Sequence, residues 1–259
     1  MEPEAPKHWP QEIQEMITLY NVSGQRCRAV NKEIIVPQDN RYQMACMLAG
    51  FKDILFTENF EALDDLPLNL LKLYNKSNIH DVGFAYPSYL GGVSRERIFY
   101  TPHGFRNALL LAKNILEKNL ESFESNRPQE NSYLTGTLLN YRNEDKDFFE
   151  IYPVFIQWYM GQTSKSRAQL EAQFKLIEFP GWDQQTKDAF LLFEREIFPQ
   201  TSAFDKLQQT KKDAHNWINA QSSFSVQNLH QQIQALMNQS FAQHPAEEES
   251  EESSQEESD

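Results

Sequence analysis

The chain has 259 residues, of which 40% are hydrophobic and 12% aromatic, so it can bury a sizeable core. It carries 37 acidic and 24 basic residues, and eight of the acids lie in the last thirteen positions, Glu247 to Asp259. The remainder holds 29 acids against 24 bases, a net charge of −5, which excludes the broad basic face of a general nucleic-acid binder. No apolar run approaches the roughly 20 residues that cross a bilayer, so we expect no membrane span.

The two cysteines, Cys27 and Cys46, are fewer than a secreted domain of this size with a disulfide framework usually has. We expect two buried free thiols in a reducing compartment, with one disulfide as the alternative. The first ten residues, MEPEAPKHWP, are acidic and lack the apolar segment of a secretory signal peptide. These features predict a protein that is cytoplasmic in the cell that makes it, and that would leave only by a route without a classical leader.

Short helices and one hairpin are predicted for the first 75 residues. The hairpin is expected at 26–36, with Asn31-Lys32 as its two-residue turn. Thr57 is placed to cap a short helix that carries Glu58 and Glu61 in its first turn and breaks at Pro67. The other helices are expected at residues 10–20, 39–50 and 68–73.

The segment from Ile79 to Thr101 differs from its surroundings. HDVGFAY and RERIFYT are alternating stretches on either side of Gly91-Gly92, which predicts two short strands joined by a glycine-containing loop. After it the chain is expected to be helical, and Thr101-Pro102 opens a long amphipathic helix. The later helices are predicted to end near residue 141, to start at 144 with Pro153 inside, and to cover 164–177, 183–198, 203–220 and 225–241.

These elements define a mainly α fold, or α+β with a minor β element. We expect a helical bundle-like body with one or two short hairpins in its first 100 residues. Residues 1–245 would form a single, mostly helical domain, with a subdivision into an α+β part (1–100) and a helical part (101–242) as the alternative. Residues 246–259 are predicted to be a disordered acidic tail, because they offer no apolar surface to offset the entropy of ordering.

The last predicted helix has a possible second role. Its apolar residues recur at the spacing of a short coiled-coil seam, at Val226, Leu229, Ile233 and Leu236. About two heptads are too few to specify a coiled coil, so packing on its own bundle is the simpler interpretation. Binding of a partner, or oligomerisation, is the alternative.

The first candidate site is an anion-binding site around Gly91-Gly92. Arg95 and Arg97 share one strand face, because side chains two residues apart point the same way. His103 and Arg106 would lie in the first turns of the helix capped by Thr101, where free N–H groups and the helix dipole favour a phosphate or carboxylate. The alternative is a solvated strand face on which these arginines pair with surface acids such as Glu96.

The sequence also offers two candidate catalytic arrangements. His80-Asp81 in NIHDVGF resembles the His-Asp core of HD-type metal phosphohydrolases, a resemblance that implies adjacent metal ligands; the simpler reading is an end-of-helix histidine and a turn aspartate. Cys46 with His80 or His103 could form a thiol nucleophile and its base, although Cys46 lies in the apolar stretch MACMLAG, which favours a buried, inert thiol. The sequence contains no complete cofactor motif, and we expect neither a cofactor nor a metal.

A DxD pattern, Asp145-Lys146-Asp147, resembles that of metal-dependent glycosyltransferases. Its context is helical rather than the end of a strand, and the helix dipole alone explains acids in a first turn. The pattern is therefore read as part of a helix start.

The acidic tail carries the remaining resemblance. Its composition is similar to the glutamate-rich C-terminal patch of effectors translocated by type IV secretion systems of intracellular bacteria, and the matching residues are Glu247, Glu248, Glu249, Glu251, Glu252, Glu256 and Glu257. The resemblance implies recognition of the tail by a secretion machinery and translocation into a host cell. The sequence thus predicts an effector-like or adaptor protein that binds a host or cellular protein. The alternative is an enzyme, a hydrolase or transferase, that acts on an anionic or phosphorylated substrate.

Overall fold

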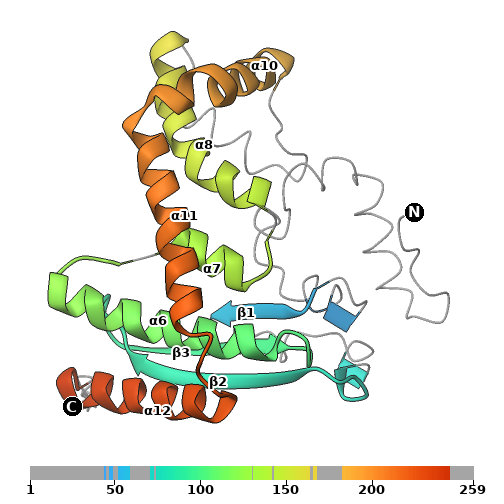
Figure 1. Ribbon diagram of the computed structural model, residues 1–259, viewed down its shortest axis with the longest axis vertical. Coiled ribbons are helices and arrows are strands. Elements are labelled where there is room, and N and C mark those ends of the chain that lie inside the picture. Colours follow the sequence, from blue (N-terminus) through green and yellow to red (C-terminus); the bar gives the residue numbers. More distant parts are fainter. Residues whose placement is uncertain are drawn as a thin grey trace, which may run out of the picture.

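The computed structural model describes residues 44, 47–48, 52–58, 71–72, 74–129, 131–141, 143–163, 166–167 and 183–245. Within these residues the chain is mostly helical, with six α-helices and one three-stranded antiparallel sheet (Figure 1). This confirms a mainly α fold with a minor β element. The predictions for residues 1–43, Cys46, most of 164–177 and the acidic tail lie outside the described residues, and the division into domains stays a prediction.

The sheet consists of β1 (Ile54–Glu58), β2 (His80–Pro87) and β3 (Val93–Tyr100), in the spatial order β1-β3-β2. β2 and β3 form the predicted hairpin. Gly91 and Gly92 lie in its turn at φ values of 103° and 69°, a left-handed conformation that glycine adopts without steric cost. The hairpin is therefore specified locally, by strand alternation and by the glycine pair.

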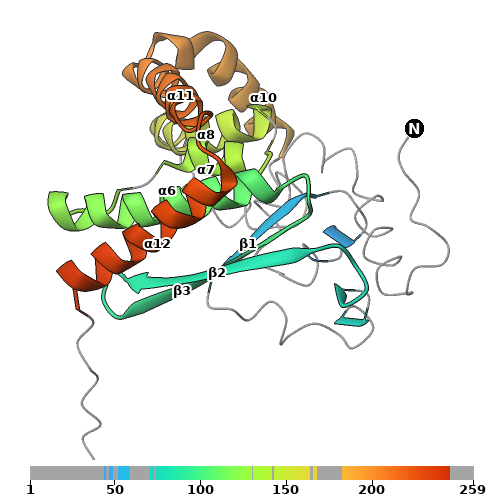
Figure 2. The same cartoon turned by 60° about the horizontal axis from the view of Figure 1, so that its bottom comes forward.

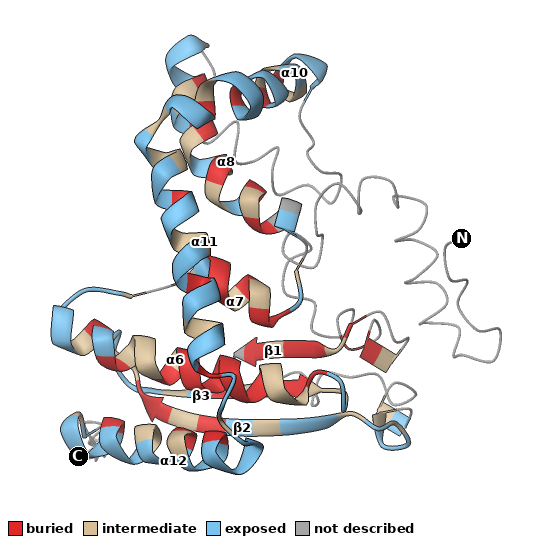
Figure 3. Cartoon of the chain, viewed as in Figure 1, coloured by how far each residue is buried: buried red, intermediate tan, exposed pale blue. Residues whose placement is uncertain are grey.

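One face of the sheet is covered by two helices, α6 (Phe105–Ser125) and α12 (Val226–Gln243), which lie side by side across it (Figure 2). Ile54, Phe84 and Ile98 point into this layer and are buried there. Figure 3 shows buried residues concentrated where α6 meets the sheet. Strands expose alternate side chains to each face, so the helices bury one set from every strand.

The last helix packs on the body, as the simpler interpretation predicted. Leu229 and Ile233 of α12 are buried, and the helix contacts both α6 and β2. Val226 and Phe241, near the two ends of α12, are partly exposed.

The opposite face of the sheet has its own apolar contacts. Leu55 and Phe99 are fully buried there, and the ring of Tyr74 meets Phe99 edge-on with the centroids 5.9 Å apart. Both faces of the central strand are thus covered.

Two predicted helix starts are wrong. Thr57 lies in β1, opposite Arg97 of β3, and its hydroxyl donates to the Arg97 carbonyl at 3.3 Å. Pairing with β3, some 40 residues away, overrides the local capping signal, because it satisfies the backbone groups and buries Ile54 and Leu55 on opposite faces. Thr101 does not cap α6, since its hydroxyl donates to Asp53 Oδ1 at 2.6 Å and the helix begins after Gly104.

Gly104 is required at that position for steric reasons. A Cβ built on it would lie 2.4 Å from the carbonyl oxygen of Asp53 and 2.7 Å from a side-chain carbon of Ile54. The start of α6 therefore approaches β1 as closely as only glycine permits.

The remaining helices form the second part of the molecule, and α11 rises away from the sheet layer (Figure 1). The predicted helices at 183–198 and 203–220 are confirmed, although the first ends in a π turn and a 3₁₀ turn. Asp183 caps its start by accepting the Thr186 N–H at 2.8 Å. The bounds are α7 Ser132–Leu138, α8 Asn143–Gln162, α10 Gln184–Leu192, η1 Phe193–Ile197, η2 Phe198–Gln200 and α11 Ser202–Ala220.

Aromatic side chains fill the core of this second part. Phe155 of α8 is fully buried, and its ring lies 5.2 Å from Tyr159, 5.1 Å from Phe190 and 5.6 Å from Phe193. The helical spacing of the aromatic residues of α8 places these rings on the face that packs against α10 and η1.

Candidate functional site

His80 and Asp81 lie at the start of β2 and point to opposite faces of the sheet. His80 Nε2 is 3.0 Å from Asn78 Oδ1, and its ring lies 5.9 Å from that of Tyr100. Asp81 instead faces Arg97, with Oδ2 and Nε 3.5 Å apart. Neighbouring residues of a strand alternate in direction, so the two side chains do not adopt the shared-metal arrangement that the HD resemblance implies.

Arg95 and Arg97 share a strand face, as the sequence analysis expected. Arg97 is engaged there by Asp81, and its guanidinium lies 5.8 Å from the centre of the Phe99 ring. Burial, and then the charge of Asp81, raise the pKa of the nearby Tyr74 hydroxyl. This face holds an internal ion pair beside an apolar surface, and Arg95 is exposed next to it.

Arg106 has a structural role that the sequence did not reveal. Its two terminal nitrogens donate to the carbonyl oxygens of Phe224 at 2.9 Å and Gln221 at 2.6 Å. These carbonyls belong to the connection from α11 to α12, more than 110 residues away in the chain. Arg106 therefore ties α6 to this connection, while His103 is exposed in the turn before α6. The predicted anion-binding residues are not gathered in one cavity.

One cavity of the structure lies at the turn end of the β2–β3 hairpin. It has a volume of about 410 Å³ and opens beside α6, the α6–α7 connection and the first turn of α7. None of the predicted site residues that the structure describes lines it. The lining residues are Phe56, Tyr86, Ser88, Tyr89, Leu90, Glu96, Asn114, Ile115, Lys118, Asn119, Ser122, Pro128, Gln129, Asn131, Ser132 and Thr135.

One face of α6 forms a wall of this pocket. Asn114, Lys118 and Ser122 are four residues apart and so lie on one helix face. Asn119 docks the hairpin on this wall, because its amide donates to the Pro87 carbonyl at 2.8 Å and accepts the Tyr89 N–H at 3.1 Å. The end of β2 and the hairpin turn are thereby held against α6.

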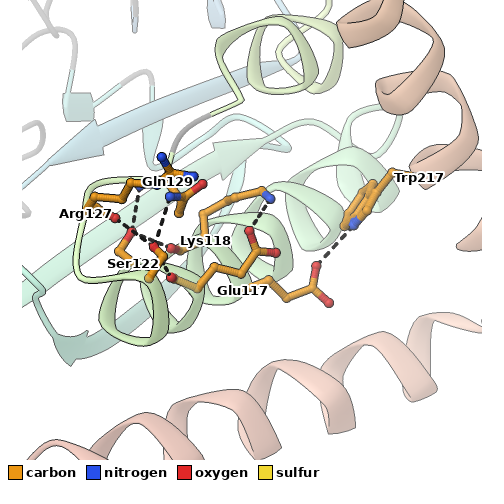
Figure 4. Close-up of polar contacts among 8 residues, drawn as sticks. Glu117, Lys118, Ser122, Arg127, Gln129 and Trp217 are labelled. Carbon is orange, nitrogen blue, oxygen red and sulfur yellow. Dashed lines mark hydrogen bonds and ion pairs between the residues drawn. The ribbon is translucent and has the colours of Figure 1, made fainter.

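The connection between α6 and α7 is also tied to that wall. Ser122 Oγ donates to the Lys118 carbonyl at 2.7 Å and accepts the backbone N–H of Gln129 at 2.8 Å (Figure 4). On the far side of α6, the Trp217 indole donates to Glu117 at 3.2 Å. The pocket wall is thus braced both by its own loop and by α11.

The pocket is lined by buried polar groups. Glu96 is 6% exposed, and one of its carboxylate oxygens accepts the Tyr86 hydroxyl at 3.3 Å. Asn114 is 2% exposed, and no described residue donates a hydrogen bond to its Oδ1. Buried side-chain acceptors normally have a partner, which makes Asn114 unusual.

Glu96 was interpreted from the sequence as a surface acid, and that interpretation is wrong. It has the strand parity of Ile98 and Tyr100, which face α6, and so it points away from Arg95 and Arg97. Because side chains two residues apart share a strand face, the segment RERIFY already indicated that Glu96 lies on the same face as Ile98. The pocket itself could not be predicted, because its walls come from four separate segments.

A second polar cluster joins α7, α8 and α11. Lys211 Nζ is paired with Asp147 at 2.7 Å, and Lys146 Nζ donates to Thr137 at 2.9 Å. Burial, and then the charge of Asp147, raise the pKa values of Tyr133 and Glu194. Asp147 of the DxD pattern is therefore part of an ion pair between helices.

In the part of the chain that the structure describes, no three His, Cys, Asp or Glu side chains are grouped so that they could hold a metal ion. None of the described helices is long and apolar enough to cross a membrane.

Comparisons with protein-family models, curated proteins and solved structures give no match. The fold and the site alone therefore define the class: a mainly helical protein with a small antiparallel sheet and an open pocket at its hairpin turn, lined by apolar and polar side chains.

Proposed function

We propose that this protein is an effector-like or adaptor protein that binds a partner protein at the turn end of its β2–β3 hairpin. The observation that carries the proposal is the pocket together with Leu90, which lies at its mouth and is 83% exposed. Leu90 stands on a turn that Asn119 anchors to α6. Val93, 39% exposed, follows the same turn, and exposed apolar side chains grouped beside a pocket are a feature of protein-binding surfaces.

The arrangement of polar residues supports binding over catalysis. Among the described residues that line the pocket there is neither histidine nor cysteine, and those with a charge at neutral pH are Glu96 and Lys118. The enzyme alternative requires His80, Asp81, His103 and the arginines to share a cavity, and the described geometry separates them. Acid–base and nucleophilic catalysis both need such groups within hydrogen-bond reach of one another.

The tail belongs to the same proposal as a delivery signal read by a secretion machinery. Its support is compositional: the chain after Pro245 carries seven glutamates and one aspartate. Deletion of residues 246–259 should abolish transfer of a reporter fusion into host cells and leave the unfolding midpoint of the body unchanged. Undiminished transfer would contradict this part of the proposal.

Site-specific photocrosslinking tests the binding surface. A photoreactive amino acid at position 90 should give adducts of discrete mass in cells that contain the partner. The matched control is position 191, because Leu191 is also an exposed leucine, 60% exposed, but lies on α10 in the second part of the molecule. Absence of adducts at position 90, or equal adducts at both positions, would contradict the proposal.

A further inference from the structure

We infer that the pocket at the hairpin turn binds a tryptophan side chain of the partner protein, whose indole N–H donates to the side chain of Asn114. This inference rests on the proposed function and adds the chemistry of the partner. Asn114 supplies the hydrogen-bond acceptor, Phe56 and Ile115 supply apolar walls, and Leu90 supplies a neighbouring contact at the mouth.

The first argument is the buried side chain of Asn114. It lines the pocket and is 2% exposed, and its Oδ1 receives no hydrogen bond from a described residue. Half a turn about the last side-chain bond exchanges the amide oxygen and nitrogen, so the oxygen can be turned toward the pocket while the helix stays in place. A buried acceptor without a partner costs free energy, and a ligand that brings an N–H to it removes this cost.

The second argument is that a neutral donor fits this lining. The charged residues of the described lining are Glu96 and Lys118, and each is already engaged within the protein. Glu96 accepts the Tyr86 hydroxyl at 3.3 Å, and the Lys118 ammonium lies 2.5 Å from Glu121 Oε2. The indole of tryptophan carries one N–H and no acceptor, so a bond to Asn114 leaves none of its own polar atoms unpaired. The phenol of tyrosine also carries an acceptor, which would need a second donor.

The third argument concerns the size and the walls of the pocket. Its volume of about 410 Å³ is within the range of roughly 300–1,000 Å³ that is usual for ligand pockets. Three aromatic rings and one aliphatic side chain line it: Phe56, Tyr86, Tyr89 and Ile115. Contacts between aromatic rings gain free energy beyond the area that they bury. The Tyr89 ring meets Phe123 edge-on with the centroids 5.6 Å apart, so this wall is formed before a ligand arrives.

The fourth argument distinguishes a protein side chain from a free indole compound. The pocket is open to solvent, so a small molecule bound in it would keep part of its ring in water. Leu90 and Val93, both exposed at the hairpin turn, would also stay uncovered. A peptide segment with an apolar residue beside its tryptophan would cover these two side chains and close the mouth of the pocket. Tryptophan anchors surrounded by contacts that exclude water dominate the energy of many protein interfaces.

The test uses the full chain and fluorescence anisotropy with two peptides, fluorescein-Gly-Ser-Leu-Trp-Leu-Ser-Gly-amide and its twin with 3-benzothienylalanine in place of tryptophan. Benzothienylalanine keeps the shape of the ring and has sulfur where the indole has its N–H. The tryptophan peptide should bind about tenfold more tightly, because its N–H satisfies a buried acceptor that the sulfur leaves unpaired. Equal affinity, or no binding of either peptide, would overturn the inference, and so would tighter binding of a tyrosine twin.

Variants locate the hydrogen bond. Asn114→Leu removes the acceptor at similar side-chain size, so the tryptophan and benzothienylalanine peptides should then bind equally. Asn107→Leu is the matched control, because Asn107 lies on the same helix but does not line the pocket, and it should keep the tenfold difference. If Asn114→Leu fails to fold, Asn114→Ala provides the same comparison. A tenfold difference that persists in a folded Asn114 variant would overturn the inference.

N-acetyltryptophanamide, which carries the indole without a peptide, distinguishes the two sources of the ligand. It should bind at least about tenfold more weakly than the peptide, and Leu90→Ser should weaken only the peptide. Equal binding of this compound, insensitive to Leu90→Ser, would replace the partner side chain with a free indole compound and overturn the inference. Failure of all tryptophan probes together with persistent crosslinks at position 90 would reject tryptophan and leave partner binding in place, whereas loss of the crosslinks would reject the proposed function itself.

Discussion

The two parts of the molecule differ in how strongly aromatic side chains dominate the core. The sheet layer with α6 encloses Glu96, Asn114 and Ser122 next to its apolar core, whereas the part built from α8, α10, η1 and α11 is packed with aromatic rings such as Phe155 and Phe193, with Lys146 and Thr186 buried beside them. A buried polar group lowers stability unless it has a hydrogen-bond partner. Buried polar groups are therefore a poor way to stabilise a fold. From this difference we expect the aromatic part to contribute most of the stability, and we propose that the sheet layer carries the binding surface.

The largest effect is expected from the aromatic part. Phe155→Ala should lower the free energy of unfolding by about 3–5 kcal/mol, because it leaves a cavity among several rings. Chemical denaturation measures this loss. Phe149→Ala is the control on the same helix, since Phe149 is 46% exposed, and it should cost less than about 1 kcal/mol. Equal losses in both variants would contradict the role of the aromatic core in stabilising the protein.

A smaller effect is expected where the two parts meet. Arg106→Ala should lower the free energy of unfolding by about 2–3 kcal/mol, because two carbonyls of the α11–α12 connection lose their charged donor. Hydrogen exchange should show the start of α12 opening more often, while the amides of α8 keep their protection. A variant as stable as the unchanged protein would show that the guanidinium bonds contribute no net stability.

A substitution in the pocket should raise the free energy of unfolding instead of lowering it. Asn114→Leu replaces a buried acceptor that lacks a described donor by an apolar side chain of similar size, so unfolding should become harder by about 1 kcal/mol. A destabilised Asn114→Leu variant would mean that Asn114 is part of the scaffold and would remove the contrast between the two parts.

The smallest effect concerns the pH dependence of the helical part. Burial, and then the charge of Asp147, raise the pKa of Glu194 above its ordinary value of 4.5, so the folded state disfavours the ionised carboxylate. Glu194→Gln should therefore raise stability at pH 7, by less than about 1 kcal/mol because solvent screens an exposed group.

The gain from Glu194→Gln should shrink as pH falls through the raised pKa and vanish below 4.5, where the carboxyl is protonated in both folded and unfolded chains. Thermal unfolding of both proteins across this range measures it. A gain that stays constant with pH would show that packing, rather than the charge of Glu194, causes it.

Local patterns predicted most of the elements correctly. The hairpin at 80–100 follows from strand alternation and the Gly91-Gly92 pair, and α11 and α12 follow from helical spacing and end signals. β1 was missed, because Thr57 followed by glutamates also matches a helix start, and only pairing with β3 decides between the two. Propensity is a weak prior when a partner strand lies elsewhere in the chain.

The candidate site was less predictable than the fold. Arginine and histidine attracted attention because their side chains commonly bind anions, yet Arg97 and Arg106 are engaged in internal contacts. Glu96 could have been found from its strand parity with Ile98. Asn114 carried no signal, because an asparagine in a helix is ordinarily a surface residue.

The sequence by itself determined the mainly α composition, the hairpin at 80–100, the described helices after residue 101 and the difference in charge between the last residues and a nearly balanced body. These properties depend on periodicity and composition, which act over a few residues. Only the tertiary structure decided that Glu96 and Asn114 share a pocket, that Leu90 stands at its mouth and that Arg106 holds a distant connection. Such contacts join segments from 18 to 118 residues apart, and their energy exists only once the chain has folded.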